Sequence, residues 1–330
     1  MDHDKVSVEQ ISLGSLSLAI NGSTIWGEEN RAQRLLDYIS SVREDLITKE
    51  QIPACSLLRL VSVTNDITAE IGRWQRQLGE PVLTSTDELG EVVGKTLTWG
   101  DGEPESTFAV IILAEGMALG MLEEGSSEAK SLCVGMLAHE LTHVHDYYRQ
   151  IRTFGKDHLV YAADWGNLCR EIAINMWSEF HAESVAYSYA GELDSDSQVL
   201  LAVNYVRKST QDIQRAIATY RLDRDMPALW SFVTSTLSKT LNQVGRAMGL
   251  LSSRDDDHEM ETFFGKIDEI SLDWGVIARK LTAEFKLITE TRWNIETFSN
   301  LGQKVERVFH ASGLYPKGSD EKQGLWVDVP

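Results

Sequence analysis

The residue pattern of this chain changes near Ser126, and this change limits the folds that the chain can adopt. Before residue 116, short apolar runs such as Leu57 to Val63 and Phe108 to Leu113 alternate with segments of helical periodicity. This pattern predicts strands mixed with helices. After Ser126 the apolar residues recur at helical spacing almost to the end of the chain. We therefore expect an α+β fold with a mainly helical C-terminal region.

The same pattern predicts the domain organisation. We expect a first domain over 1–194, with a mixed α/β part over 1–115 and two long helices within 126–191. A helical region over 195–330 follows, with three or four amphipathic stretches (197–221, 227–251, 257–290 with a turn near 273–275, and 291–312) and a tail from Tyr315. A chain of 330 residues can bury the core of one large domain or of two modest ones.

The charge balance and the cysteines narrow the partners and the compartment. The chain has 50 Asp and Glu against 31 Lys and Arg, a formal net charge of -19. Nucleic acid and anionic membranes attract positively charged proteins, so we expect neither as a partner. The widely spaced Cys55, Cys133 and Cys169 predict reduced thiols. With no secretory signal and no apolar run of membrane-spanning length, we expect a cytoplasmic protein; export by a signal-independent route stays open.

The most informative segment contains the pattern His-Glu-x-x-His. His139 and His143 are four residues apart, so on a helix both imidazoles point the same way. Two neutral imidazole nitrogens can take two corners of a tetrahedral zinc site. Glu140 lies about 100° further round the helix. Its carboxylate can accept a proton from metal-activated water without binding the metal, so the segment indicates a zinc hydrolase.

A catalytic zinc needs a third protein ligand and one open position. Glu179 and Glu183 share one face of the second long helix. One of them can bind zinc, and the other can accept the spare N–H of a ligating histidine. Asp164 is the alternative third ligand. Asp146 returns to the face of the histidine pair, where it either supports a ligand or bonds a neighbour, whereas His145 is out of phase and is expected to be exposed or structural.

Two segments within residues 132–190 resemble gluzincin metallopeptidases. Residues 139–143 read His-Glu-Leu-Thr-His, which is identical to the motif core of thermolysin-like peptidases. Residues 179–186 read Glu-Phe-His-Ala-Glu-Ser-Val-Ala, which resembles the prenyl-protease-type pattern Glu-Phe-x-Ala-Asp-x-x-Ala. This chain departs from that pattern at Glu183, where the family usually has aspartate, and it lacks the membrane helices of the prenyl-protease group.

The resemblance implies a zincin-like core and a zinc-dependent peptidase. It assigns His139, His143 and Glu179 as ligands of Zn2+, Glu183 as the residue that orients a ligand, and Glu140 as the general base. The expected substrate is a protein or peptide, bound as an extra strand at an edge strand that precedes the motif helix. The predicted strand Phe108 to Leu113 is either this edge strand or an interior one.

Two other functions stay open at this point. One is a non-catalytic regulatory or scaffold protein that keeps the metal site for folding or sensing. The other is an effector or toxin protease with a single intracellular target, which would use the same mechanism. The pattern predicts no oligomeric state.

Overall fold

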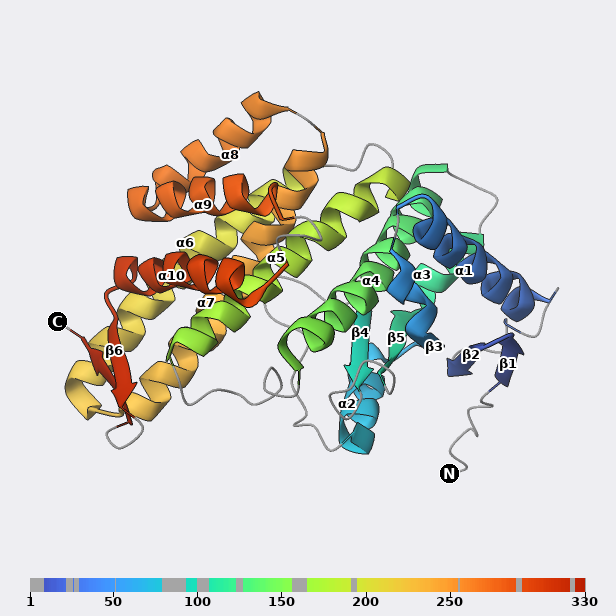
Figure 1. Ribbon diagram of the computed structural model, residues 1–330, viewed down its shortest axis with the longest axis horizontal. Helices are drawn as coiled ribbons and strands as arrows, with labels where there is room; N and C mark the ends of the chain where they lie inside the picture. Colours follow the sequence, from blue (N-terminus) through green and yellow to red (C-terminus); the bar gives the residue numbers. More distant parts are fainter. Residues whose placement is uncertain are drawn as a thin grey trace. The chain divides into compact units, whose positions relative to one another are not determined.

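The computed structural model describes residues 9–21, 26, 30–50, 52–78, 93–99, 107–122, 127–155, 165–190, 195–254, 256–288, 293–320 and 324–329 (Figure 1). The predicted α+β class is confirmed, since a five-stranded sheet before residue 115 is followed by mainly helical structure. The chain forms two compact units, one from 1–156 with 185–193 and the other from 157–184 with 194–330. The domain boundary expected at residue 194 stays a prediction.

The first unit is built on a mixed sheet with the strand order β1-β2-β3-β5-β4. Strands β2, β3 and β5 are parallel, whereas β1 and β4 pair antiparallel with their neighbours. Because β5 lies between β3 and β4, the segment Phe108 to Leu113 is an interior strand, and β4 is an edge. The strands are β1 (Glu9–Leu13), β2 (Leu16–Asn21), β3 (Leu58–Thr64), β4 (Gly94–Trp99) and β5 (Phe108–Ala114).

Helices cover both faces of this sheet (Figure 1). On β5, Ile111 and Leu113 join the larger core with α1, α3 and α4, while Val110 and Ile112 pack with Ile71 of α2 on the opposite face. This two-sided burial accounts for the continuous apolar run of β5. The helices are α1 (Arg31–Thr48), α2 (Ile67–Leu78), α3 (Glu115–Leu122) and α4 (Ser127–Phe154), with a short 3-10 helix, η2 (Pro53–Leu57), before β3.

Helix α4 and the last turns of α5 (Trp165–Ala190) pack closely within the first unit. A Cβ atom on Gly135 would lie 2.5 Å from the Cβ of Ala190 and 3.2 Å from the carbonyl oxygen of Ala186. A side chain at this position would therefore push the two helices apart. The predictions of long helices over 126–153 and 167–191 are confirmed by α4 and α5.

The second unit is helical and ends in a hairpin. The stretch expected over 257–290, with a turn near 273–275, is two helices, and the break lies slightly earlier, between Asp268 and Leu272, where the hydroxyl of Ser271 caps the second helix. The segment after Tyr315, expected as a tail, contains two antiparallel strands. Its elements are α6 (Ser195–Asp223), α7 (Met226–Ser253), α8 (Asp257–Asp268), α9 (Leu272–Phe285), α10 (Ile295–Ala311), β6 (Tyr315–Asp320) and β7 (Gly324–Asp328).

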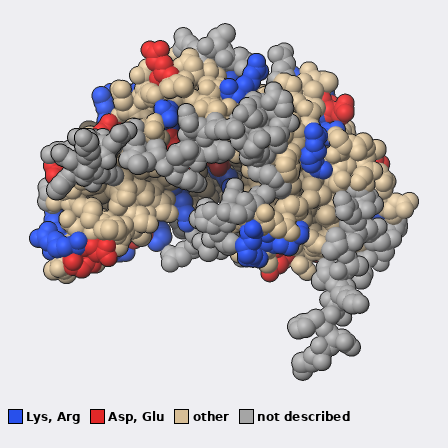
Figure 2. Space-filling model, turned by 60° about the horizontal axis from the view of Figure 1, so that its bottom comes forward, with Lys and Arg blue, Asp and Glu red and all other residues tan. Residues whose placement is uncertain are grey.

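The described helices and the charges on the surface bear on the partners that the sequence predicts. Among the described helices, none has both the length and the apolar composition needed to cross a membrane. On the face drawn in Figure 2, small groups of Lys and Arg alternate with groups of Asp and Glu. The net charge of -19 therefore does not make this face uniformly acidic.

Candidate metal centre

The histidine pair of α4 presents two ring nitrogens to one point. The Nε2 atoms of His139 and His143 are 3.0 Å apart, and the rings meet edge to face with centroids 4.6 Å apart. Ligand nitrogens of a tetrahedral zinc ion are separated by roughly 3.3 Å, given Zn–N bonds of about 2.0–2.1 Å. His139 is buried and His143 is half-buried. The spacing of the pair therefore fits a metal ion held between the two rings.

Glu179 supplies the third group. Helix α5 is continuous, so Glu179 is carried on the same helix whose last turns pack on Gly135 of α4. One ligand atom each from His139, His143 and Glu179 lies within 4.8 Å of the other two. These are the three residues that the resemblance to gluzincins assigned to the metal. Two imidazoles and one carboxylate suit zinc and also other divalent transition metals, so the donor set alone does not specify the ion.

The carboxylate of Glu179 also accepts a hydrogen bond from α7. The Nε of Arg246 lies 2.6 Å from Oε2 of Glu179, and both side chains are mostly buried. This contact is possible because α7 approaches α5 at backbone distance. A Cβ on Gly245 would lie 2.5 Å from the carbonyl oxygen of Met176. Arg246 thus holds Oε2 of the Glu179 carboxylate.

The carboxylate of Glu140 lies against the edge strand β4. The hydroxyl of Thr96 is 2.7 Å from Oε2 and 2.8 Å from the main-chain oxygen of Glu140. Next to it, a Cβ on Gly94 would lie 3.2 Å from both Cγ and Oε1 of Glu140. Glu140 is 4 % exposed. The side chain of the predicted general base therefore packs against Gly94 and accepts a hydrogen bond from Thr96, both in the edge strand β4.

The remaining predicted residues lie on or near the same helices. Glu183 is half-buried on α5, and His145 is buried on α4, which agrees with a structural role. Asp146 is fully buried near Cys55: burial, assisted by the charge of Asp146, raises the pKa of Cys55 to about 12. Asp164 lies outside the described residues. The supporting roles of Glu183 and Asp146 stay predictions.

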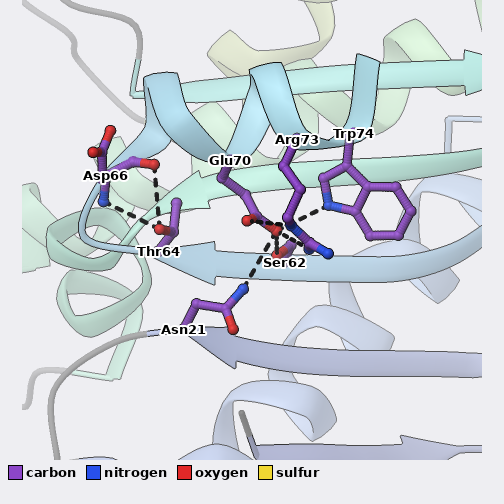
Figure 3. Close-up of polar contacts among 7 residues, drawn as sticks. All are labelled: Asn21, Ser62, Thr64, Asp66, Glu70, Arg73 and Trp74. Carbon is purple, nitrogen blue, oxygen red and sulfur yellow. Dashed lines mark hydrogen bonds and ion pairs between the residues drawn. The ribbon is translucent and has the colours of Figure 1, made fainter. Parts of the chain in front are cut away.

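A second polar cluster of the first unit surrounds Glu70 of α2 (Figure 3). Its carboxylate accepts hydrogen bonds from Asn21, Ser62, Arg73 and Trp74, with the Ser62 hydroxyl at 2.6 Å. Burial, the largest single influence, raises the pKa of Glu70. The hydrogen bonds from Arg73, Ser62 and Trp74 and the charge of Arg73 together outweigh it, so the pKa is lowered. This cluster is a satisfied structural network rather than a site.

Comparison with protein families, with curated proteins and with solved structures finds no match to this chain. The metal centre is therefore described from its own geometry. Thr96, Gly94 and Arg246 belong to its surroundings and were not anticipated from the sequence. For Thr96, the sequence offered one signal. Side chains of a strand alternate between its two faces, and Leu97 packs on the α2 side, so Thr96 faces α4. For Arg246, 67 residues from Glu179, the sequence holds no local signal.

Proposed function

We propose that this chain is a zinc-dependent peptidase of the zincin type, which hydrolyses peptide bonds in a protein or peptide substrate. The observation that carries the proposal is the convergence of ligand atoms from His139, His143 and Glu179 within 4.8 Å. The carboxylate of Glu140 follows the first ligand directly in the chain and is held at the sheet edge. Zinc in this donor set polarises a scissile carbonyl and activates water.

The chain's own residues supply the proton transfer. Glu140 accepts a proton from the attacking water and delivers it to the leaving amine nitrogen, so the water oxygen stays with the new carboxyl group. Burial of Glu140 keeps competing solvent away from this carboxylate. Glu183 and Asp146 would support the ligating histidines through hydrogen bonds, as the sequence predicts.

Strand β4 takes the role of substrate strand, instead of the interior β5. Within the described residues β4 pairs with β5 on one side. The amide of Ala114 donates to the carbonyl of Val93, so these two residues form a hydrogen-bonded antiparallel pair. By the alternation of such pairs, the main-chain groups of Gly94, Thr96 and Thr98 point to the open edge. An extended peptide can add there through main-chain hydrogen bonds.

A second candidate function is a non-catalytic metal-binding regulatory or scaffold protein. The ion pair between Arg246 and Glu179 favours it, because a guanidinium that holds the ligand carboxylate ties the metal to the packing of α5 and α7. In that case metal would contribute to folding without turnover. An effector with one intracellular target shares the peptidase mechanism and differs in the number of proteins that it cleaves.

The test compares the wild type with Glu140→Gln, and uses Glu128→Gln, an exposed residue of the first turn of α4, as the matched control. Zinc content is measured by mass spectrometry of the purified proteins, and cleavage by sequencing new N-termini in a whole-proteome digest. We expect all three proteins to hold one zinc ion, and cleavage by Glu140→Gln to fall by about 100-fold or more.

Each outcome separates the functions. Zinc in every protein without cleavage by any of them supports the scaffold and refutes the peptidase. Equal cleavage by the wild type and Glu140→Gln contradicts the assigned base, and absence of zinc from the wild type contradicts both functions. One cleaved protein rather than many indicates the effector.

A further inference from the structure

The contact between Thr96 and Glu140 joins two parts of the proposed machinery that the sequence treats separately. Thr96 belongs to β4, whose open edge is the proposed binding site for the substrate, and Glu140 is the proposed general base on α4. The two residues are 44 positions apart in the chain. Their hydrogen bond therefore links substrate binding to catalysis through a single side chain.

The hydroxyl of Thr96 makes this contact with Glu140. The hydroxyl has one proton and lies within hydrogen-bonding distance of two oxygens of Glu140, one in the carboxylate and one in the main chain. Among the described residues, Thr96 donates the side-chain hydrogen bond to this carboxylate, at 2.7 Å. Gly94 leaves room for the carboxylate beside the strand, because a Cβ there would lie 3.2 Å from Oε1.

The alternation of the strand gives Thr96 its double function. Its side chain faces α4, since the neighbouring Leu97 packs with Val110 and Ile112 on the opposite face of the sheet. Its amide and carbonyl point to the open edge, since the hydrogen-bonded pairs with β5 fall on the alternate residues. A peptide paired with β4 would thus fix the main chain of the residue whose hydroxyl holds Glu140.

We infer that Thr96 is a positioning residue, which holds the carboxylate of Glu140 in place for proton transfer and makes that placement depend on occupancy of the β4 edge. The inference rests on the proposed function. Loss of the hydroxyl leaves the main-chain pairing of β4 intact, so substrate binding is retained. The carboxylate loses its donor, and a displacement of about 1 Å can lower the rate of a positioned reaction by up to 100-fold.

The first test needs no substrate. Glutamate is labelled with 13C at the carboxylate, and the resonance of Glu140 is identified by its absence from Glu140→Gln. We expect Thr96→Val, which keeps the shape of the side chain, to displace this resonance, and Thr96→Ser, which keeps the hydroxyl, to leave it near its wild-type position. Thr282→Val, which removes a buried hydroxyl bonded to the oxygen of Ala278 in the second unit, is the control. An unchanged resonance in Thr96→Val refutes the inference.

The second test uses a peptide that the wild type cleaves. We expect Thr96→Val to lower kcat by roughly 10- to 100-fold with KM within about twofold of the wild type, and Thr96→Ser to restore most of kcat. Thr282→Val should keep the wild-type constants, although its thermal stability falls. A change in KM alone, or failure of Thr96→Ser to recover kcat, overturns the inference. If the wild type cleaves nothing, the proposed function fails, and the carboxylate resonance still decides whether Thr96 holds Glu140.

Discussion

Two polar clusters place carboxylates in opposite surroundings. Around Glu70, hydrogen-bond donors from two strands and from α2 itself converge on one acceptor (Figure 3). Around His139 and His143, lone-pair donors converge instead, since two imidazole nitrogens lie 3.0 Å apart and a carboxylate oxygen of Glu179 is within 4.8 Å. The first cluster is complete within the protein. The second presents lone pairs that a cation could accept.

The difference shows how a buried carboxylate is assigned to structure or to chemistry. A buried charge is tolerated when protein donors or a metal compensate for the lost water. Glu70 has its compensation from the guanidinium of Arg73 and from uncharged donors. Glu179 has the guanidinium of Arg246 on Oε2, and one of its carboxylate oxygens lies within 4.8 Å of a ring nitrogen of each histidine. Variants of the two clusters should therefore change different quantities, stability in one case and metal affinity in the other.

The largest effect is expected from removal of a ligating histidine. His143→Gln removes one of three ligands, and structural zinc sites bind with about 10–16 kcal/mol in total, so zinc affinity should fall by roughly 100-fold or more. Competition with a chromophoric chelator measures this affinity. His310→Gln, at a half-exposed histidine of α10, is the control and should keep wild-type affinity. Equal affinity of His143→Gln and the wild type would show that the histidine pair holds no metal.

The next effect concerns Glu70. Glu70→Gln removes a buried charge and leaves Arg73 without its anion, so the free energy of unfolding should fall by about 2–4 kcal/mol while zinc affinity is kept. Urea denaturation gives the free energy. Asp45→Asn removes an exposed ion pair with Lys49 and should change stability by less than about 1 kcal/mol. A loss of zinc by folded Glu70→Gln would contradict the separation of the two clusters.

Removal of the guanidinium from Glu179 should have a smaller effect. Arg246→Gln takes away the bond that orients the carboxylate, and such supporting partners typically contribute about 10- to 100-fold to metal affinity. We expect a decrease near the lower end, about tenfold, because the loss of a competing positive charge partly compensates. Arg246→Lys should recover part of the affinity. Tighter zinc binding by Arg246→Gln would show that the ion pair restrains the ligand instead of orienting it.

The smallest effect is the pH dependence of the Glu70 cluster. The pKa of Glu70 is lowered in the folded protein from an ordinary value of 4.5, so the charged form stabilises the fold above that pH. This contribution is lost as pH falls through the lowered pKa. The stability difference between the wild type and Glu70→Gln should therefore narrow as the pH falls below 4.5. A gap that widens in acid would contradict the sign of the shift.

The sequence predicted the parts of the site that depend on helical periodicity. His139 and His143 recur at one turn, so the pair follows from residue type and period. Periodicity placed Glu179 and Glu183 on one face of a second helix, and the resemblance to the gluzincin pattern selected Glu179 between them. The α+β class follows in the same way from runs of apolar residues. These are local signals, and they survive without knowledge of the tertiary structure.

The other contacts are non-local, and the sequence has no comparable signal for them. Thr96 lies on the edge strand β4 and reaches Glu140, which is 44 residues further along the chain. Arg246 reaches Glu179 because Gly245 lets α7 approach α5. Likewise, four polar residues of ordinary appearance meet at Glu70. Periodicity predicts which face a residue lies on, but not which element packs there.

The glycine at position 135 has a consequence for how the centre could be adjusted. Its missing side chain sets the spacing between α4 and the end of α5, where Ala190 would collide with any added carbon. Alanine or serine at this position would add one or two side-chain atoms between the helices and increase their separation. The proposed zinc affinity would then vary in steps with helix separation, although no ligand residue is changed.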